Sequence, residues 1–193
     1  YDETHLIGLG KDAIPDENGD FAWFQGVKLS LFDVSDVEHP REIDSFSIGD
    51  RGSDSYALQD HKAFLFDRAR NLLVIPVRVA EINEGNKVNE NYESEGKRSR
   101  KTTPQTYGQN VFQGAYVFDV DENGFTLEGK ISHASEEERR QQYGGATDVV
   151  RSAFIQDTLY TVSDKYIKAN DLDTLENEGK IKLPYLDNYA YPE

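Results

Sequence analysis

Side chains that could bind a ligand or act in catalysis are concentrated in one short stretch of the chain. Their carboxylates, guanidinium and imidazole could converge as oxygen ligands, as a paired-carboxylate site with a histidine base, or as a polar binding surface. Asp and Ser side chains also bond their own backbone in tight turns, and an arginine there can be a structural counter-ion. The sequence leaves both interpretations open. The residues concerned are Asp50, Arg51, Asp54, Asp60 and His61.

Three aromatic residues form a second candidate group. Phe21, Trp23 and Phe24 follow an acidic turn-like segment, Asp16–Asp20. Clustered aromatic side chains on a loop are typical anchors for a protein or a sugar, and we take Trp23 as the candidate binding residue. The same residues could equally lie on a strand edge and pack against the sheet.

A third candidate group could hold calcium. Asp119, Asp121 and Asn123 have the alternating spacing with which an EF-hand loop begins, where side-chain oxygens surround the ion. The twelfth position, however, is Lys130 instead of the glutamate that such a loop requires. Asn123-Gly124 is also a strong hairpin-turn signal. We keep these three residues as a possible calcium site beside the simpler interpretation of a hairpin turn, and no other cofactor is indicated.

Several kinds of chemistry lack the residues that they need. The chain has no cysteine, which rules out disulfides, thiolate catalysis and cysteine-ligated metals. It contains no nucleophile elbow, no phosphate-binding P-loop and no complete dinucleotide-binding motif. The four histidines are isolated from one another along the sequence. We therefore assign no catalytic residue.

The charge of the chain bears on its partners. It has 36 acidic and 21 basic residues, a formal net charge of −15. Such a surface repels a phosphate backbone, so we expect no nucleic-acid partner. It would suit basic partners or divalent cations. No apolar run approaches the roughly 18 residues that a membrane-spanning helix needs, so we expect no membrane span in this fragment.

The elements that must position these residues follow a repeat. A strand-like run ending in Asp, an acidic turn and a second strand occur three times, and each unit has a strand-like segment upstream and room for one more strand. This order predicts the four-stranded antiparallel blade of a β-propeller. The three copies are Val27–Ile48, Gly114–Ile131 and Tyr166–Leu183, with Asp33, Asp119 and Asp171 aligned.

We therefore predict an all-β fold of about three four-stranded antiparallel blades, a partial β-propeller over residues 1–193. The blades span approximately 1–50, 51–133 and 146–190. The second contains a polar, charged insert at 81–109, and a short helix at 135–143 follows it, begun by a capping box. Three blades cannot close a ring, and the first lacks its earliest strand. We expect the remaining blades of a larger ring to come from the same longer chain or from another subunit.

Parts of this sequence resemble the secreted β-propeller domain proteins of archaea and bacteria. The similarity is carried by Tyr1–Gly8, Lys28–Val37, Gly49–Ser55, Asp60–Phe66 and Gln113–Phe118, and it corresponds to the C-terminal part of that domain. The resemblance implies an exported or cell-surface protein, and it implies no established activity.

The prediction for function is a scaffold or binding module, extracellular or at the cell surface, whose partner is a protein or a carbohydrate. Two alternatives stay open at this point. One is a hydrolase or lyase with an acidic site near the propeller axis. The other is a structural repeat stabilised by calcium.

Overall fold

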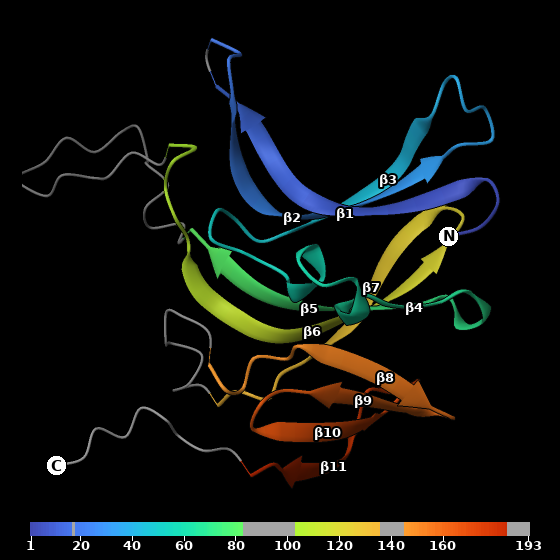
Figure 1. The fold of residues 1–193 in the computed structure, drawn as a ribbon, viewed down its shortest axis with the longest axis vertical. Coiled ribbons are helices and arrows are strands. Elements are labelled where there is room, and N and C mark those ends of the chain that lie inside the picture. Colours follow the sequence, from blue (N-terminus) through green and yellow to red (C-terminus); the bar gives the residue numbers. More distant parts are fainter. Residues whose placement is uncertain (17, 83–102, 136–144, 185–193) are drawn as a thin grey trace, which may run out of the picture.

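Three antiparallel sheets make up the described part of the chain in the computed structural model (Figure 1). The structure describes residues 1–16, 18–82, 103–135 and 145–184. The sheets follow one another along the chain, and the last strand of each leads to the first strand of the next.

The first sheet contains β1 (His5–Pro15), β2 (Ala22–Asp33) and β3 (Arg41–Ile48) in that spatial order. The second contains β4 (Leu65–Asp67), β5 (Leu72–Glu81), β6 (Gln109–Asp121) and β7 (Gly124–Ile131). The third contains β8 (Arg151–Ile155), β9 (Thr158–Val162), β10 (Tyr166–Asp171) and β11 (Asn177–Lys182). Three single-turn 3-10 helices lie near β4: η1 (Tyr56–Leu58), η2 (His61–Ala63) and η3 (Arg68–Arg70).

These sheets confirm the predicted all-β fold of consecutive antiparallel blades. The second and third sheets have four strands each, whereas the first has three. β2, β6 and β10 are equivalent, because each is followed by a turn and the last strand of its sheet. β1 therefore corresponds to β5 and β9, and the first sheet has no counterpart of β4 and β8 among the described residues. The three sheets form an open stack instead of a closed ring (Figure 1).

The repeated aspartates close the turns after these equivalent strands. Asp33 accepts hydrogen bonds from the amide and the hydroxyl of Ser35, and Asp171 accepts from the amides of Asp173 and Thr174. In the second sheet Asp121, not Asp119, takes this role. β6 continues for two residues beyond Asp119, so the turn is formed one side-chain repeat later.

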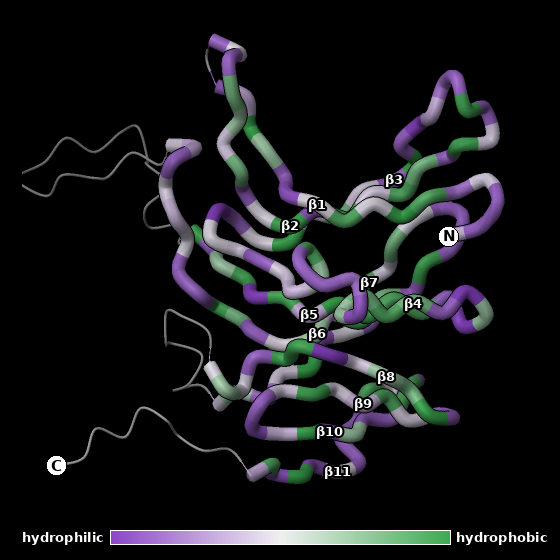
Figure 2. The backbone as a smooth tube through the Cα atoms, in the orientation of Figure 1, coloured by the Kyte–Doolittle hydropathy of each residue, from purple (hydrophilic) through white to green (hydrophobic). Residues whose placement is uncertain are grey.

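Two hydrophobic cores lie between the sheets. The larger core joins the first and second sheets and is centred on residues such as Leu29, Ile75 and Phe118, which are fully shielded from solvent. The smaller core joins the second and third sheets and includes Val117 and Leu159. β5 is buried along most of its length because it contributes to both cores, which explains its nearly continuous apolar sequence. Figure 2 shows the hydrophobic residues, in green, along the strands that face a neighbouring sheet.

Two predicted features fall largely outside the described residues. The predicted insert at 81–109 begins with the last residue of β5 and ends with the first residue of β6, and its middle, 83–102, is not described. All of the predicted helix at 135–143 except Ser135 lies outside the described residues as well. In the part of the chain that is described, no helix is long and apolar enough to cross a membrane.

Candidate binding surface and polar cavity

The connection from β3 to η1, residues 49–55, positions several predicted site residues. It runs along the edge of β5, where Asp54 and Arg78 exchange two backbone hydrogen bonds of 2.9 and 2.8 Å. The Asp50 amide donates to the carbonyl of Ala80 at 2.7 Å. The connection thus covers a strand edge that β4, with three residues, is too short to cover. Its side chains are consequently held at fixed positions.

The three candidate carboxylates do not share one site. Asp50 accepts a hydrogen bond from the amide of Ile82 at 2.7 Å. Asp54 forms an ion pair with Lys11 at 2.9 Å. Because these two carboxylates are engaged by different groups, Asp50 and Asp54 do not form a paired-carboxylate site with each other.

Asp60 is the third of these carboxylates, and it has two partners of its own. It caps η2 by accepting a hydrogen bond from the Lys62 amide, and it bonds the Arg151 guanidinium at 2.6 Å. The hydrogen bond from Arg151 is the main reason why the pKa of Asp60 falls to about 2. His61 is exposed at the start of η2. Asp60 therefore connects the second sheet to the third as an ionised structural group.

Trp23 and Arg51, by contrast, are brought together. The Arg51 guanidinium carbon lies 5.2 Å from the centroid of the Trp23 ring and 4.5 Å from that of Tyr107. The guanidinium also donates to the Phe24 carbonyl and the Tyr107 hydroxyl, both at 3.1 Å. Two cation–π contacts and two hydrogen bonds thus hold this arginine in one orientation at the protein surface.

The neighbouring rings extend this cluster into an aromatic surface. Phe21 packs edge-on against Trp23 with 4.9 Å between ring centroids. The rings of this cluster that reach solvent are Phe21 and Tyr107, with exposed fractions of 50% and 67%. Phe24 follows Trp23 in β2, so its side chain points to the opposite face of the strand. We name this group the aromatic–arginine surface and define it as Phe21, Trp23, Arg51 and Tyr107.

Tyr107 is the member that sequence reasoning missed, because it lies within the predicted polar insert. The glycine after it places it: a Cβ on Gly108 would lie only 2.7 Å from the backbone nitrogen of Glu81. The Gly108 amide also donates to the Arg51 carbonyl at 2.8 Å. This close approach brings Tyr107 back onto the sheet. The sequence signal that could have pointed to Tyr107 is a tyrosine followed by a glycine at the end of a charged segment.

The calcium candidates form a hairpin turn in this structure. Asp121 accepts hydrogen bonds from the amides of Asn123 and Gly124, at 2.7 and 3.1 Å, and from the side-chain amide of Asn123. These bonds, led by that from the Asn123 side chain, lower the pKa of Asp121. Asp119 lies in the ladder opposite Leu72. Among the described residues no group of three or more His, Asp or Glu side chains is placed to hold a metal ion. Calcium binding stays a prediction, which melting curves with and without chelator can test.

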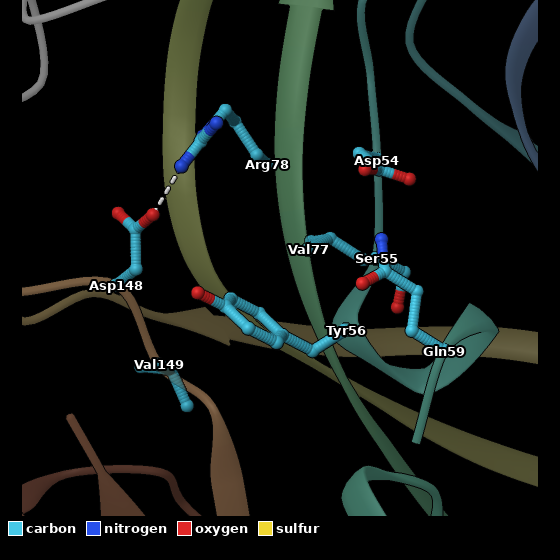
Figure 3. Close-up of a pocket in the computed structure, with 8 residues that line it drawn as sticks. All are labelled: Asp54, Ser55, Tyr56, Gln59, Val77, Arg78, Asp148 and Val149. Atoms are coloured by element: carbon cyan, nitrogen blue, oxygen red, sulfur yellow. Dashed lines mark hydrogen bonds and ion pairs between the residues drawn. The ribbon is translucent and has the colours of Figure 1, made fainter. Parts of the chain in front are cut away.

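A polar cavity of about 240 Å³ lies between the second and third sheets (Figure 3). Arg78 projects from β5 and bonds the carboxylate of Asp148, which lies in the turn before β8. Asp148 is 6% exposed. Its oxygen Oδ1 and the Nε of Arg78 are buried without a hydrogen-bond partner among the described residues. Gln59 and Asp54 line the opposite side of the cavity, and the Tyr56 ring reaches from that side toward Asp148 (Figure 3).

The fold defines the class of protein. Consecutive antiparallel sheets, each leading from its last strand into the next sheet, form part of a β-propeller, a fold used generally for binding and scaffolding. The chain belongs to the family described as Beta propeller domain, which matches residues 1–175.

Two archaeal proteins are similar to this chain over nearly its whole length. The uncharacterized protein MJ1554 of Methanocaldococcus jannaschii is 24% identical over 186 residues, which is 96% of this chain and 21% of that protein. An uncharacterized protein of Archaeoglobus fulgidus is 25% identical over 182 residues, 94% of this chain and 19% of that protein. The chain therefore spans about a fifth of the length of these relatives. No solved structure matches it significantly.

Proposed function

We propose that this chain is the partner-binding part of a scaffold protein outside the cell or at its surface, and that it binds another protein through the aromatic–arginine surface. The observation that carries the proposal is the grouping of exposed aromatic rings around a fixed arginine. Tryptophan, tyrosine and arginine are the residue types most enriched where protein interfaces concentrate their binding energy.

The geometry of Arg51 supports a role in binding. Its guanidinium is already ordered by Trp23, Tyr107 and the Phe24 carbonyl, so little side-chain entropy is lost when a partner docks. The exposed ring of Phe21, which packs on Trp23, offers apolar area beside it. An apolar centre with a fixed hydrogen-bonding group is the usual anatomy of a protein-binding patch.

The charge of the chain favours a partner with a basic rim. A formal net charge of −15 attracts such a partner over a distance of about one Debye length and steers it during encounter. Aromatic rings also stack on sugars, so a carbohydrate partner is the competing outcome of the experiment below.

The test begins with the natural protein in its full length. Proteins cross-linked to it on intact cells are identified by mass spectrometry, and each candidate is then purified and its affinity measured by surface plasmon resonance. We expect Tyr107→Ala to weaken binding at least tenfold, about 1.4 kcal/mol. The matched control is Val37→Ala, because Val37 is 82% exposed on another loop.

Two results would contradict the proposal. One is a purified partner whose affinity is the same for the wild type, Tyr107→Ala and Phe21→Ala. The other is a glycan array that gives saturable binding lost in Tyr107→Ala while no protein partner binds, which would assign the surface to carbohydrate.

The location is a separate part of the proposal. The sequence resemblance to secreted propeller proteins supports it. The expected result is that protease added to intact cells digests the protein while a cytoplasmic marker survives. Digestion only after lysis would place the protein inside the cell and would remove this part of the proposal.

A further inference from the structure

We propose that the polar cavity between the second and third sheets binds a single neutral sugar unit. This site is distinct from the aromatic–arginine surface and does not depend on it. The cavity has about 240 Å³, below the range of roughly 300–1,000 Å³ that is typical for drug-sized ligands, so its ligand is small.

A mostly buried ion pair lines one side of the cavity. Arg78 and Asp148 bond each other, yet Asp148 Oδ1 and Arg78 Nε have no further partner among the described residues. A buried polar atom without a partner costs free energy. Both atoms are closed to solvent, so a ligand in the cavity would contact the solvent-facing part of Arg78, whose side chain is 25% exposed, instead of these two atoms.

The wall of the cavity adds further polar groups and an aromatic face. The Tyr56 ring is 45% exposed, and its hydroxyl points toward the side of the cavity where Asp148 and Val149 lie (Figure 3). Gln59 and Asp54 line the opposite side (Figure 3). A carboxylate, an amide, a guanidinium and a phenol around a small apolar patch can bond the hydroxyls of a sugar while the ring covers its C–H face.

The charges around the cavity favour a neutral ligand. Asp148 is paired with Arg78, and Asp54 is paired with Lys11 at 2.9 Å. A cationic ligand would compete with Arg78 and Lys11 for these carboxylates, and an anionic ligand would approach the carboxylates of Asp148 and Asp54. Each hydroxyl of a neutral sugar both donates and accepts, which matches the mixture of donors and acceptors among the lining residues Arg78, Tyr56, Gln59 and Asp54.

Binding of free monosaccharides to the full-length natural protein tests this inference. Glucose, galactose, mannose and N-acetylglucosamine are titrated by isothermal calorimetry, with glucosamine and glucuronate as charged counterparts. We expect at least one neutral sugar to bind with a dissociation constant of about 1 mM or tighter, near −4.1 kcal/mol. The charged sugars should bind at least threefold more weakly.

Variants locate the site. Tyr56→Ala should weaken sugar binding at least tenfold, and Tyr56→Phe should weaken it less because the ring is kept. Since Tyr56 is exposed, both variants should melt at the temperature of the wild type. Tyr107→Ala, in the aromatic–arginine surface, is the matched control and should bind the sugar normally.

Three outcomes would overturn the inference. They are no saturable binding of any neutral monosaccharide, tighter binding of glucosamine or glucuronate than of the neutral sugars, and binding that is unchanged in Tyr56→Ala but lost in Tyr107→Ala. The first two leave the proposed protein binding untouched, so the two proposals can fail separately, whereas the third would also point to carbohydrate at the aromatic–arginine surface.

Discussion

The two interfaces between neighbouring sheets are built differently. The first interface, between the first and second sheets, is a large apolar core in which Leu31, Leu73 and Phe118 are fully buried. The second interface, between the second and third sheets, has a smaller apolar core and a set of buried polar residues beside it. Those polar residues are Gln113, His133, Thr147, Asp148, Thr161 and Ser163.

The polar residues of the second interface are paired across it. Gln113 in the second sheet donates to the hydroxyl of Thr147 at 3.0 Å. The ring of His133 bonds Ser163 at 2.9 Å and Thr161 at 2.8 Å. Such directional bonds fix how the third sheet sits on the second, and they leave room for the polar cavity. The apolar interface supplies mainly stability, and the polar one combines orientation with a place for a ligand.

The largest effect of a substitution on the free energy of unfolding is expected in the first interface. Phe118→Ala should lower the free energy of unfolding by about 4 kcal/mol, because the ring packs against Phe46, with 5.1 Å between centroids, and its loss leaves a cavity. Urea unfolding followed by circular dichroism measures the change. Phe24→Ala, an exposed phenylalanine, should change stability by less than about 0.5 kcal/mol. Equal effects of the two variants would contradict the assignment of the core.

The ion pair of the second interface should come next. Asp148→Ala should cost about 3 kcal/mol of unfolding free energy, because it leaves Arg78 partly buried without its partner. The double variant Arg78→Met, Asp148→Leu should recover most of that loss, since no charge is left to desolvate. If the double variant is less stable than Asp148→Ala, the ion pair of Arg78 and Asp148 is itself strongly stabilising. The contrast between an apolar interface that supplies stability and a polar one that supplies orientation would then not hold.

The polar interface should also make stability depend on pH. Burial, followed by the nearby Lys168 and Lys180, lowers the pKa of His133 to about 4. The unfolded chain takes up this proton near pH 6.5, whereas the folded chain resists it until about pH 4. Stability is therefore complete above pH 6.5 and should fall by about 2 kcal/mol by pH 4.5.

Urea unfolding at several pH values measures that fall, and His133→Gln should reduce it. The carboxylate of Asp60 does not interfere in this window, because its pKa is about 2 and it stays ionised. An identical pH dependence in wild type and His133→Gln would show that His133 is not the responsible group.

The smallest effect is expected at the rim of the second interface. Arg151 and Asp60 form an ion pair at 2.6 Å, but their side chains are 40% and 43% exposed. Arg151→Met should therefore cost only about 0.5 kcal/mol, and less at high salt. Unfolding in 0.1 and 1 M sodium chloride measures both effects. A loss as large as that of Asp148→Ala would mean that solvent exposure does not distinguish the two ion pairs.

Much of the fold could be predicted because it is repeated locally. The aspartate-ended strand, the turn and the following strand recur, and among the described residues the first sheet has three strands where the other two have four. The alignment of Asp119 was right in the strand ladder, where it lies opposite Leu72 as Asp33 lies opposite His5. It did not reveal that Asp121 closes the turn, because the length of the hairpin depends on strand pairing.

The candidate sites were predicted less well. Trp23 and Arg51 were both candidates, but nothing in their spacing indicated that the Arg51 guanidinium lies against both the Trp23 ring and the Tyr107 ring. Asp50 and Asp54 are close in sequence, yet one bonds the backbone of Ile82 and the other bonds Lys11. Closeness in sequence places residues on one loop and does not decide where their side chains point.

The sequence by itself determined the all-β class, the number of repeated units and the turn chemistry, because strand periodicity and aspartate turns depend on residues a few positions apart. Only the tertiary structure decided that one interface is apolar and the other polar. It also brought Arg78 to Asp148, 70 positions along the chain. Such pairs form when whole sheets pack on one another, and the burial that gives them their strength exists only in the folded protein.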